Sequence, residues 1–548
     1  MELQKSTLVD YFLVIGPPKP SIENHIKFQE NLTPATLSQF PPFEKESLSL
    51  PGSLASFCFP FGCDSVSATQ GAVSSLYTCV FTDELGSRVY CTCLKVFELH
   101  GTQKLVVSTQ HNSEEVHTLP INMLDEFSTE SFFGCKKTLS LNSKPSFVAE
   151  TRRINFFASE GVLVPKCLVL VSKFSFFETF KDILYTLFKL STRELDFPLE
   201  LYIAHLVFQV PAPVRGYKEV LYLLDSNIFR FSLAPCNRIP TPEVNFEVLF
   251  KALSLSNILY TFRNILLEKS VVFVSESEDK LSTCSFGLQS LLYPFHWELV
   301  YVPLLPEEFL EYLESPVNFI FGVHKKLKPK LLKKYKDSVC LVDLDEDTVN
   351  GTKHSMLSAL KGHSNTLPAL PFHYSKKLFT RVSKTLSKYN LGDFSSRRIR
   401  ESFFQFFVST MKHYKKALNF QWREESNSEI FNSKSFIRHS KRDTKNFLKA
   451  FVNTQMFNYF CLTRVRPKSI LELSECLMFD EHIQAKFNRS FFSVKASTPF
   501  INDHSLEVSK QHQILPVEKL YRATRTYKYK TFPQLNPGRL KKFGVFID

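Results

Sequence analysis

Apolar positions in the middle of the chain change their spacing several times between residues 246 and 323. Within 246–266 they recur at intervals of three and four, which predicts two short amphipathic helices with Ser254 and Ser256 as N-caps. Residues 271–274 form a continuous apolar run that is typical of a strand covered on both faces. Helix-like and strand-like segments then continue to alternate up to residue 323. This alternation predicts right-handed crossovers and a mainly parallel sheet.

The N-terminal part has a different pattern. Strand-like runs at 7–16 and 76–97, the second interrupted by a turn at 83–87, predict a small antiparallel sheet domain. Residues 101–162 are polar with isolated apolar pairs, and we interpret them as a linker or insertion. Residues 167–208 predict a buried strand and two helices. We expect them to join 246–323 in one α/β domain.

The downstream part is basic and mostly helical. Seven lysines between 325 and 336 predict a flexible basic loop, and a buried strand at 338–343 follows it. The predicted fold is therefore α/β, with an N-terminal α+β lobe and a C-terminal lobe whose mainly parallel sheet is flanked by helices. The segments that we distinguish are 1–100, 101–162, 163–324, 325–337, 338–466 and a basic extension at 467–548.

Composition supports a folded protein without a phosphate-binding loop. The 548 residues, 44% of them hydrophobic and 55 of them Phe, are enough for two or three domains with ample cores. Glycine is scarce, at 16 residues, and GxGxxG, GxxxxGK[ST] and GxSxG are all missing from the sequence. The N-terminus has no basic leader, and charges interrupt the apolar runs, so we expect a cytoplasmic protein. Its 12 cysteines include no CxxC pair.

The formal net charge of +13 is compatible with either nucleic acid or an anionic membrane surface. Most Phe residues fall on apolar faces with helical or strand spacing, which argues against nucleic-acid binding. The lysine run is the better candidate, since a basic loop attracts anionic headgroups; a solvated loop is the alternative. The candidate membrane contacts are Lys325, Lys326, Lys328, Lys330, Lys333, Lys334 and Lys336.

No motif predicts covalent chemistry or a bound cofactor. The acidic cluster Asp343, Asp345, Glu346 and Asp347 follows a predicted parallel strand, where a magnesium site is conceivable. Its spacing matches no calcium loop, so we favour a solvated strand end. Arg88, after the hairpin turn, could act as an arginine finger, although a turn arginine is usually solvated.

The order of these segments resembles the DENN-domain family. The upstream resemblance lies in DYFLVIG, FCFPFGC and FTDELGSRVYCTCLKVFE. The central resemblance lies in PKCLVLVSKFSFFETFKDILYTL, PLELYIAHLVFQVPAP, SNILYTFRNILLEKSVVFVSE and SLLYPFHWELVYVPLLPEEFLEYLESPVNFIFGVH. The downstream resemblance lies in SVCLVDLDEDTV, LPALP, RIRESFFQFFVSTMKHYKKAL and FLKAFVNTQMFNYF. About 400 residues are covered in family order, and such a series is more specific than a single motif.

The resemblance implies a longin-like upstream lobe and one α/β lobe built by the central and downstream modules. It also implies a guanine-nucleotide exchange factor in membrane trafficking, whose partner is a Rab-type small GTPase. Such an exchange factor needs no cofactor, metal or nucleophile of its own. Such a factor binds the nucleotide-free GTPase more tightly than its GDP-bound form and therefore weakens GDP binding. The alternatives are GTPase activation, with Arg88 as the arginine finger, and an exchange-dead scaffold recruited to endomembranes or vesicles by the lysine run.

The resemblance also implies that the GTPase switch segments bind in a groove between the two lobes. Three parts of the chain supply the candidate residues: the hairpin turn, the break after residue 210 and the end of the helix before Pro294. For the aromatic residues among them, core packing is the alternative. The candidates are Asp83, Glu84, Arg88, Pro211, Pro213, Arg215, Tyr293, Phe295 and Trp297.

Overall fold

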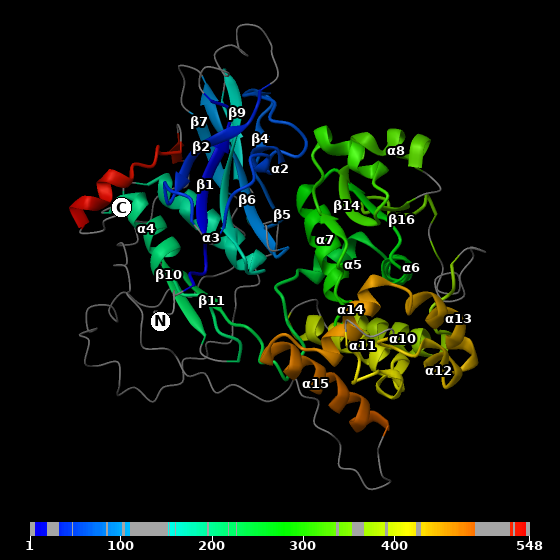
Figure 1. Ribbon diagram of the computed structural model, residues 1–548. Helices are drawn as coiled ribbons and strands as arrows, with labels where there is room; N and C mark the ends of the chain where they lie inside the picture. The colour runs from blue at the N-terminus through cyan, green and yellow to red at the C-terminus, as the bar shows by residue number, and fades with distance from the viewer. Residues whose placement is uncertain are drawn as a thin grey trace.

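The computed structural model has two lobes, which Figure 1 shows side by side. It describes residues 6–543 except for the following segments: 19–31, 46–47, 84–85, 101–104, 110–151, 153, 159, 194, 196, 217–218, 226, 336–338, 353, 355–366, 389–392, 424–428, 488–526 and 530–531. Among the helices so described, none is long and apolar enough to cross a membrane.

An antiparallel sheet with the strand order β2-β1-β9-β6-β5 forms the centre of the N-terminal lobe. Its strands are β1 (Tyr11–Gly16), β2 (Ala35–Phe40), β5 (Ser75–Thr82), β6 (Arg88–His100) and β9 (Val162–Ser172). The predicted hairpin is confirmed, since β5 and β6 pair from Thr82 and Arg88 outward.

Both faces of this sheet are covered, which explains the uninterrupted apolar runs in β1 and β9. Phe12 and Val14 face a core formed with the helices α3 and α4, whereas Leu13 and Ile15 face a core shared with α2 and the C-terminal lobe. The helices are α2 (Leu54–Cys58), α3 (Phe177–Ser191) and α4 (Leu199–Ala204), which a π-helical turn at His205–Gln209 extends. A hairpin of β10 (Val220–Leu224) and β11 (Asn227–Phe231) completes the main part of the lobe.

The C-terminal lobe contains the predicted parallel sheet. Its order is β13-β14-β12-β15-β16, and only the short β16 is antiparallel. The strands are β12 (Val271–Ser275), β13 (Val300–Val302), β14 (Phe319–His324), β15 (Cys340–Asp343) and β16 (Thr348–Val349). Val271 and Phe273 pack toward one face and Val272 and Val274 toward the other, so β12 is covered on both sides, as its sequence predicts.

Helices surround this sheet and extend into an all-helical region. Ser254, not Ser256, is the N-cap of α6, and its hydroxyl accepts a hydrogen bond from the Asn257 amide at 3.4 Å. The helices beside the sheet are α5 (Phe246–Ala252), α6 (Leu255–Leu266), α7 (Glu278–Ser290), the 3-10 helix η5 (Glu307–Glu314) and α8 (Lys328–Tyr335). The helical region comprises α10 (Phe372–Lys388), α11 (Asp393–Thr410), α12 (Ser433–Arg438), α13 (Arg442–Phe451), α14 (Gln455–Val465) and α15 (Ile470–Phe487).

The structure differs from the expectation that residues 167–208 join the C-terminal sheet. β9 instead fills the position between β1 and β6 and pairs with β6 along eleven residues, while α3 and α4 cover the N-terminal sheet. The lobes therefore divide between β11 and α5, inside the segment 163–324 that we had treated as one module. The buried, continuous apolar pattern of β9 predicts a strand but does not specify its partners.

The expected loop at 325–337 is helical over most of its described length. Lys325–Leu327 form a 3-10 turn that runs into α8, because Leu327 and Leu331, four residues apart, are buried against β12 and β14. The expected linker 101–162 contributes two paired strands, β7 (Leu105–Thr109) and β8 (Ile154–Phe157).

The expected extension at 467–548 belongs to both lobes. α15 packs beside α11 and α14 in the helical region. Farther on, β17 (Tyr527–Tyr529) pairs with β7, and the turn η8 (Pro537–Phe543) packs next to α4. The first and last residues that the structure describes thus both lie in the N-terminal lobe, where Figure 1 shows β1 and the red C-terminal segment.

Candidate functional site

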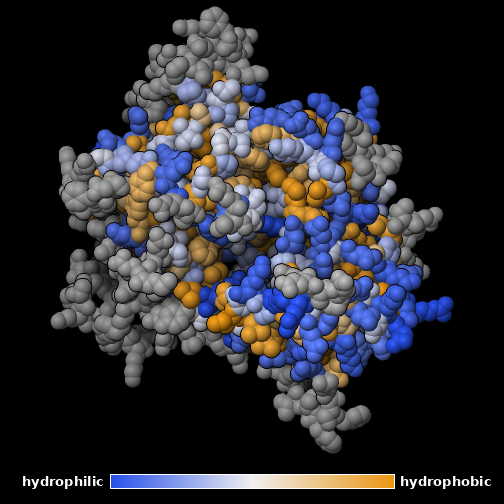
Figure 2. All heavy atoms as spheres, viewed as in Figure 1, coloured by the Kyte–Doolittle hydropathy of each residue, from blue (hydrophilic) through white to orange (hydrophobic). Residues whose placement is uncertain are grey.

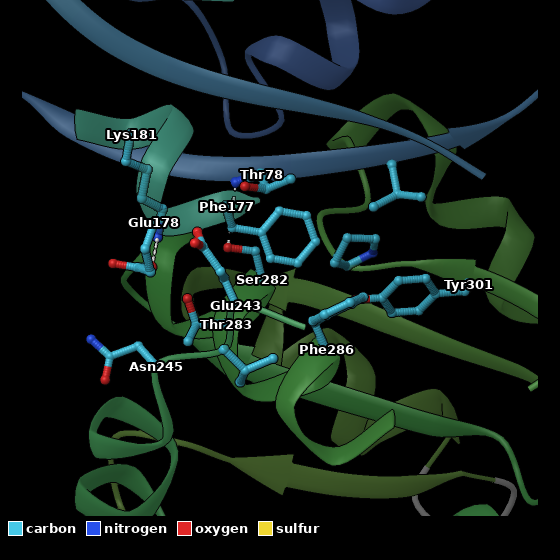
Figure 3. Close-up of a pocket in the computed structure, with 13 residues that line it drawn as sticks. Thr78, Phe177, Glu178, Lys181, Glu243, Asn245, Ser282, Thr283, Phe286 and Tyr301 are labelled. Atoms are coloured by element: carbon cyan, nitrogen blue, oxygen red, sulfur yellow. Dashed lines mark hydrogen bonds and ion pairs between the residues drawn. The ribbon is translucent and has the colours of Figure 1, made fainter. Parts of the chain in front are cut away.

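The two lobes meet where β5 of the N-terminal lobe faces α7 of the C-terminal lobe. A pocket at this junction is lined by both lobes, with Thr78 from β5, Glu178 and Lys181 from α3, and Ser282 and Phe286 from α7 (Figure 3). Phe286 packs edge-to-face on Phe177 with ring centroids 4.5 Å apart. The junction is therefore a packed interface in which aromatic contacts hold the lobes together.

Charged pairs join the lobes around this pocket. The Lys181 ammonium lies 2.6 Å from an Asp279 oxygen of α7, and Lys95 of β6 lies 2.7 Å from Glu278. Burial raises the pKa of Glu178, but the adjacent Lys181 and Arg152 outweigh this effect and lower it to about 2. These partly buried pairs fix the relative position of the lobes more strongly than exposed pairs would.

Arg88 also links the lobes. Its guanidinium donates to Gln289 Oε1 at 2.8 Å and to the carbonyl of Trp297 at 2.6 Å, and it lies over the Tyr301 ring, 5.0 Å from the centroid. Arg88 and Trp297, chosen separately from the sequence, therefore touch each other. The guanidinium is engaged inside the protein, a geometry that favours a positioning role for Arg88 over an arginine finger.

The other candidates near Trp297 are divided between core and surface. Phe295 is buried and stacks on Phe460 at 4.4 Å between centroids, which agrees with the core-packing alternative. Tyr293 is half-buried and stacks on Phe404. The side chain of His296, between them in sequence, is open to solvent. The surrounding protein and the positive charges of Arg88, Arg464 and Arg215 lower the pKa of His296 to about 4.

The remaining sequence candidates lie at the edges of the N-terminal lobe. Pro211 is exposed and forms a bridge with Thr7, whereas Pro213 is buried. The Asp83 carboxylate accepts a hydrogen bond from the Ser87 amide at 2.7 Å and lies 3.6 Å from the Lys173 ammonium. Glu84 lies outside the described residues. Arg215 pairs with Glu475 of α15 at 3.5 Å, which forms a further link between the lobes.

An exposed apolar surface on α15 accompanies this link and was not found from the sequence. Val214 is 63% exposed, and α15 adds Ile470, which is 82% exposed. We call these two residues, with Leu471, Leu473 and Leu477, the α15 patch. Figure 2 shows the surface hollowed between the lobes, with apolar atoms gathered at its lower edge over the start of α15. Ile470, Leu473 and Leu477 recur at spacings of three and four residues, a signal in the sequence for an apolar helix face, although not for its exposure.

The acidic cluster is already engaged by protein donors. Asp343 is buried and lies 2.6 Å from the Lys328 ammonium, and Asp345 pairs with Lys280 at 2.8 Å. Asp347 accepts hydrogen bonds from the Ser254 amide and the Asn257 side chain. These contacts give the cluster a structural role, which differs from both the magnesium site and the solvated strand end considered above.

Three cysteines that are far apart in the sequence meet in the core of the N-terminal lobe. The sulfur atoms of Cys58, Cys79 and Cys93 are buried and lie within 4.8 Å of one another. In the described part of the chain this is the one group that could offer a metal three ligand atoms. Cys79 and Cys93 come from paired strands, so the cluster depends on strand pairing that the sequence spacing did not reveal.

The lysine run is partly neutralised. Lys328 pairs with Asp343 and Glu346, and Lys325 lies within 3.8 Å of Glu276 and Glu346. Lys326, Lys330 and Lys333 are exposed. The Lys334 side chain and all of Lys336 lie outside the described residues.

Comparison with known proteins gives a consistent assignment. Residues 34–96 match the uDENN domain, residues 163–347 the DENN (AEX-3) domain and residues 431–482 the dDENN domain. The chain is a tripartite uDENN/DENN/dDENN protein, related to the DENN domain-containing proteins. The resemblance inferred from the sequence motifs is thus confirmed. The central DENN match, residues 163–347, crosses the division between the lobes. Residues 163–231 therefore belong to the central module by family and to the N-terminal lobe by structure.

The relatives of this DENN protein include animal and plant proteins. It is 25% identical to human DENN domain-containing protein 2C over 86% of this chain and 44% of that protein. It is 28% identical to mouse DENN domain-containing protein 2D over 46% of this chain and 51% of that protein. It is 22% identical to the Arabidopsis thaliana DENN domain and WD repeat-containing protein SCD1 over 80% of this chain and 34% of that protein. The matches thus span about half of these relatives or less.

Proposed function

We propose that this protein is a guanine-nucleotide exchange factor that promotes GDP release from a Rab-type small GTPase. Proteins of the DENN family are generally Rab exchange factors and do not catalyse covalent chemistry. The observation that carries the proposal is the presence of all three DENN modules in family order on one two-lobed structure.

The proposed docking surface is the hollow between the lobes together with the α15 patch. Exposed apolar side chains that are rimmed by charged groups are typical of protein interaction sites. Here the patch lies beside the Arg215–Glu475 pair, where both lobes contribute to one surface. A GTPase whose switch segments bind there is held by both lobes, so its nucleotide-free form can be stabilised at the expense of GDP binding.

The test is release of a fluorescent GDP analogue from each member of a Rab panel, with catalytic amounts of the full chain. We expect accelerated release from at least one Rab. Leu473→Asp, in the α15 patch, should slow that release at least about tenfold, since a charge in an interface centre is unfavourable. The matched control is Leu332→Asp on α8, an exposed leucine of the same lobe. No response from any Rab would refute exchange activity, and equal rates for the two variants would refute the docking surface.

We also propose that α8 and the turn before it contact anionic membranes. Of the seven candidate lysines, the proposal keeps the three that the structure shows to be exposed. Lys326, Lys330 and Lys333 are exposed, and each positive charge near an anionic surface contributes about 1 kcal/mol. Vesicle flotation at low and high salt tests this contact, which should weaken as salt screens the charges. Binding that is unaffected by salt and by alanine at these three lysines would count against it.

A further inference from the structure

A second pocket lies in the helical region of the C-terminal lobe and shares no lining residue with the junction pocket. Helices α10, α11, α13 and α15 contribute to its walls, and the buried Leu378 and Phe406 form part of its apolar floor. Its basic lining residues are His373, Lys377, Arg381, Lys412, His413, His439, Lys441 and Lys486. Among the residues that the structure places in its lining, there is no Asp or Glu.

The basic side chains come from separate parts of the fold and converge. Lys377 and Arg381 are exposed one turn apart on α10, so they project from the same side of that helix. The Lys441 ammonium, just before α13, lies 5.4 Å from the centre of the Tyr374 ring of α10, and the Lys412 ammonium, just after α11, lies 4.4 Å from that of Phe487 of α15. Lys486 is anchored, because its ammonium donates to Gln405 Oε1 at 2.9 Å and to Ser409 Oγ at 2.5 Å.

The local electrostatics support a positive potential in this pocket. Desolvation lowers the pKa of His373, and the adjacent Lys377 and Lys441 lower it further. Desolvation lowers the pKa of His413 as well, with contributions from Lys412, Lys416 and His439. The acidic groups nearby are Asp443, which accepts a hydrogen bond from the His373 amide at 3.3 Å, and Glu401, whose charge acts on Arg381. Two carboxylates beside five lysine and arginine side chains leave an excess of positive charge.

We propose that this pocket binds a compact anion that carries several phosphate groups, of the inositol phosphate class. A single phosphate needs only one or two cations, whereas five lysine and arginine side chains around one concavity match several phosphates on one small scaffold. The apolar floor can face the carbon ring of such a scaffold. The same chemistry occurs in a free inositol polyphosphate and in a phosphoinositide headgroup.

The experiment measures binding of the full chain to two probes without any GTPase, so that its failure is separate from failure of the exchange proposal. The soluble probe is inositol hexakisphosphate, measured by titration calorimetry, with inositol as the uncharged control. The lipid probe is a phosphatidylcholine vesicle with or without phosphatidylinositol 4,5-bisphosphate, measured by flotation. Binding of the soluble probe alone assigns a free polyphosphate. Vesicle binding that the soluble probe displaces assigns the lipid headgroup.

A matched pair of variants shows whether binding occurs in this pocket. Lys377→Ala with Arg381→Ala removes two charges from its wall, and we expect affinity to fall at least about tenfold. Lys376→Ala with Lys384→Ala removes two exposed lysines from the same helix outside the pocket and should change affinity little. All four residues are exposed, and unchanged melting temperatures verify the fold. The proposal is overturned if the wild type binds neither probe, if the two double variants bind equally, or if sulfate at equal ionic strength displaces the probe as well as the inositol phosphate does.

Discussion

At the scale of single residues, Arg88 joins the two lobes through three contacts of one side chain. One guanidinium of the N-terminal lobe contacts the side chain of Gln289 and the main chain of Trp297 in the other lobe. We expect Arg88→Ala to lower the free energy of unfolding by about 2–3 kcal/mol, because hydrogen bonds to a charged group contribute that much. Arg88→Lys should not restore stability, since an ammonium cannot reproduce the planar, two-sided contact.

Chemical denaturation of both variants measures this effect, with Arg230→Ala in β11 as a control from the same lobe. GTP hydrolysis by a responsive Rab is the complementary measurement. If Arg88 were an arginine finger, Arg88→Ala would abolish stimulated GTP hydrolysis without loss of stability. That result would contradict the positioning role of Arg88.

His296 should make the free energy of unfolding depend on pH. Its pKa is about 4 in the folded protein, below the usual 6.5, so the folded state resists protonation while the unfolded chain accepts a proton. The contribution of His296 is therefore fully present above pH 6.5 and is lost as pH falls from 6.5 to 4. Because the ring is exposed to solvent, the expected loss is about 1 kcal/mol. Unfolding curves of the wild type and His296→Gln should differ in pH dependence in this interval; parallel curves would contradict the prediction.

At the scale of elements, α8 combines a structural lysine with exposed ones. Lys328→Ala leaves the buried Asp343 carboxylate without its ammonium partner, and we expect a loss of about 3 kcal/mol in unfolding free energy. Lys330→Ala with Lys333→Ala should leave stability nearly unchanged, since both side chains are exposed. Urea denaturation compares the two variants. Equal stability would mean that the Lys328–Asp343 pair contributes nothing, despite the burial of Asp343.

The elements also show what the sequence can and cannot predict. Local patterns predicted the β5–β6 hairpin and the parallel strands correctly, because spacing and turn residues are encoded nearby. β9 was assigned to the wrong sheet, because a strand buried on both faces has no sequence feature that names its neighbours. For the candidate site, Arg88 and Trp297 were both named as candidates from the sequence, but their contact was not predicted. The α15 patch was missed because its exposure depends on how α15 packs beside α11 and α14.

At the scale of the whole molecule, a segment near the C-terminus packs into the N-terminal lobe. Phe532 is buried in the N-terminal core, its ring lies 6.3 Å from that of Phe12, and its amide donates to Glu98 Oε1 at 2.8 Å. Farther along, the Asn536 amide donates to Glu200 Oε1 at 2.8 Å. The amides of Phe532 and Asn536 thus each donate to a buried carboxylate of the N-terminal lobe. The N-terminal lobe is therefore completed by a segment that follows all of the C-terminal lobe in the sequence.

This packing predicts that a change near the C-terminus destabilises the N-terminal lobe. We expect Phe532→Ala to lower the free energy of unfolding by about 3 kcal/mol, the usual cost of truncating a buried Phe. The matched control is Phe420→Ala, whose side chain is 54% exposed and should contribute little. Hydrogen exchange locates the effect, which should be faster exchange in β1, β9 and α4 and little change in β12 and β14. If exchange instead became equally faster in both sheets, the two lobes would unfold as one unit. That result would contradict a local effect of the C-terminal segment and would mean that the contacts at the junction, including those of Arg88, couple the unfolding of the lobes.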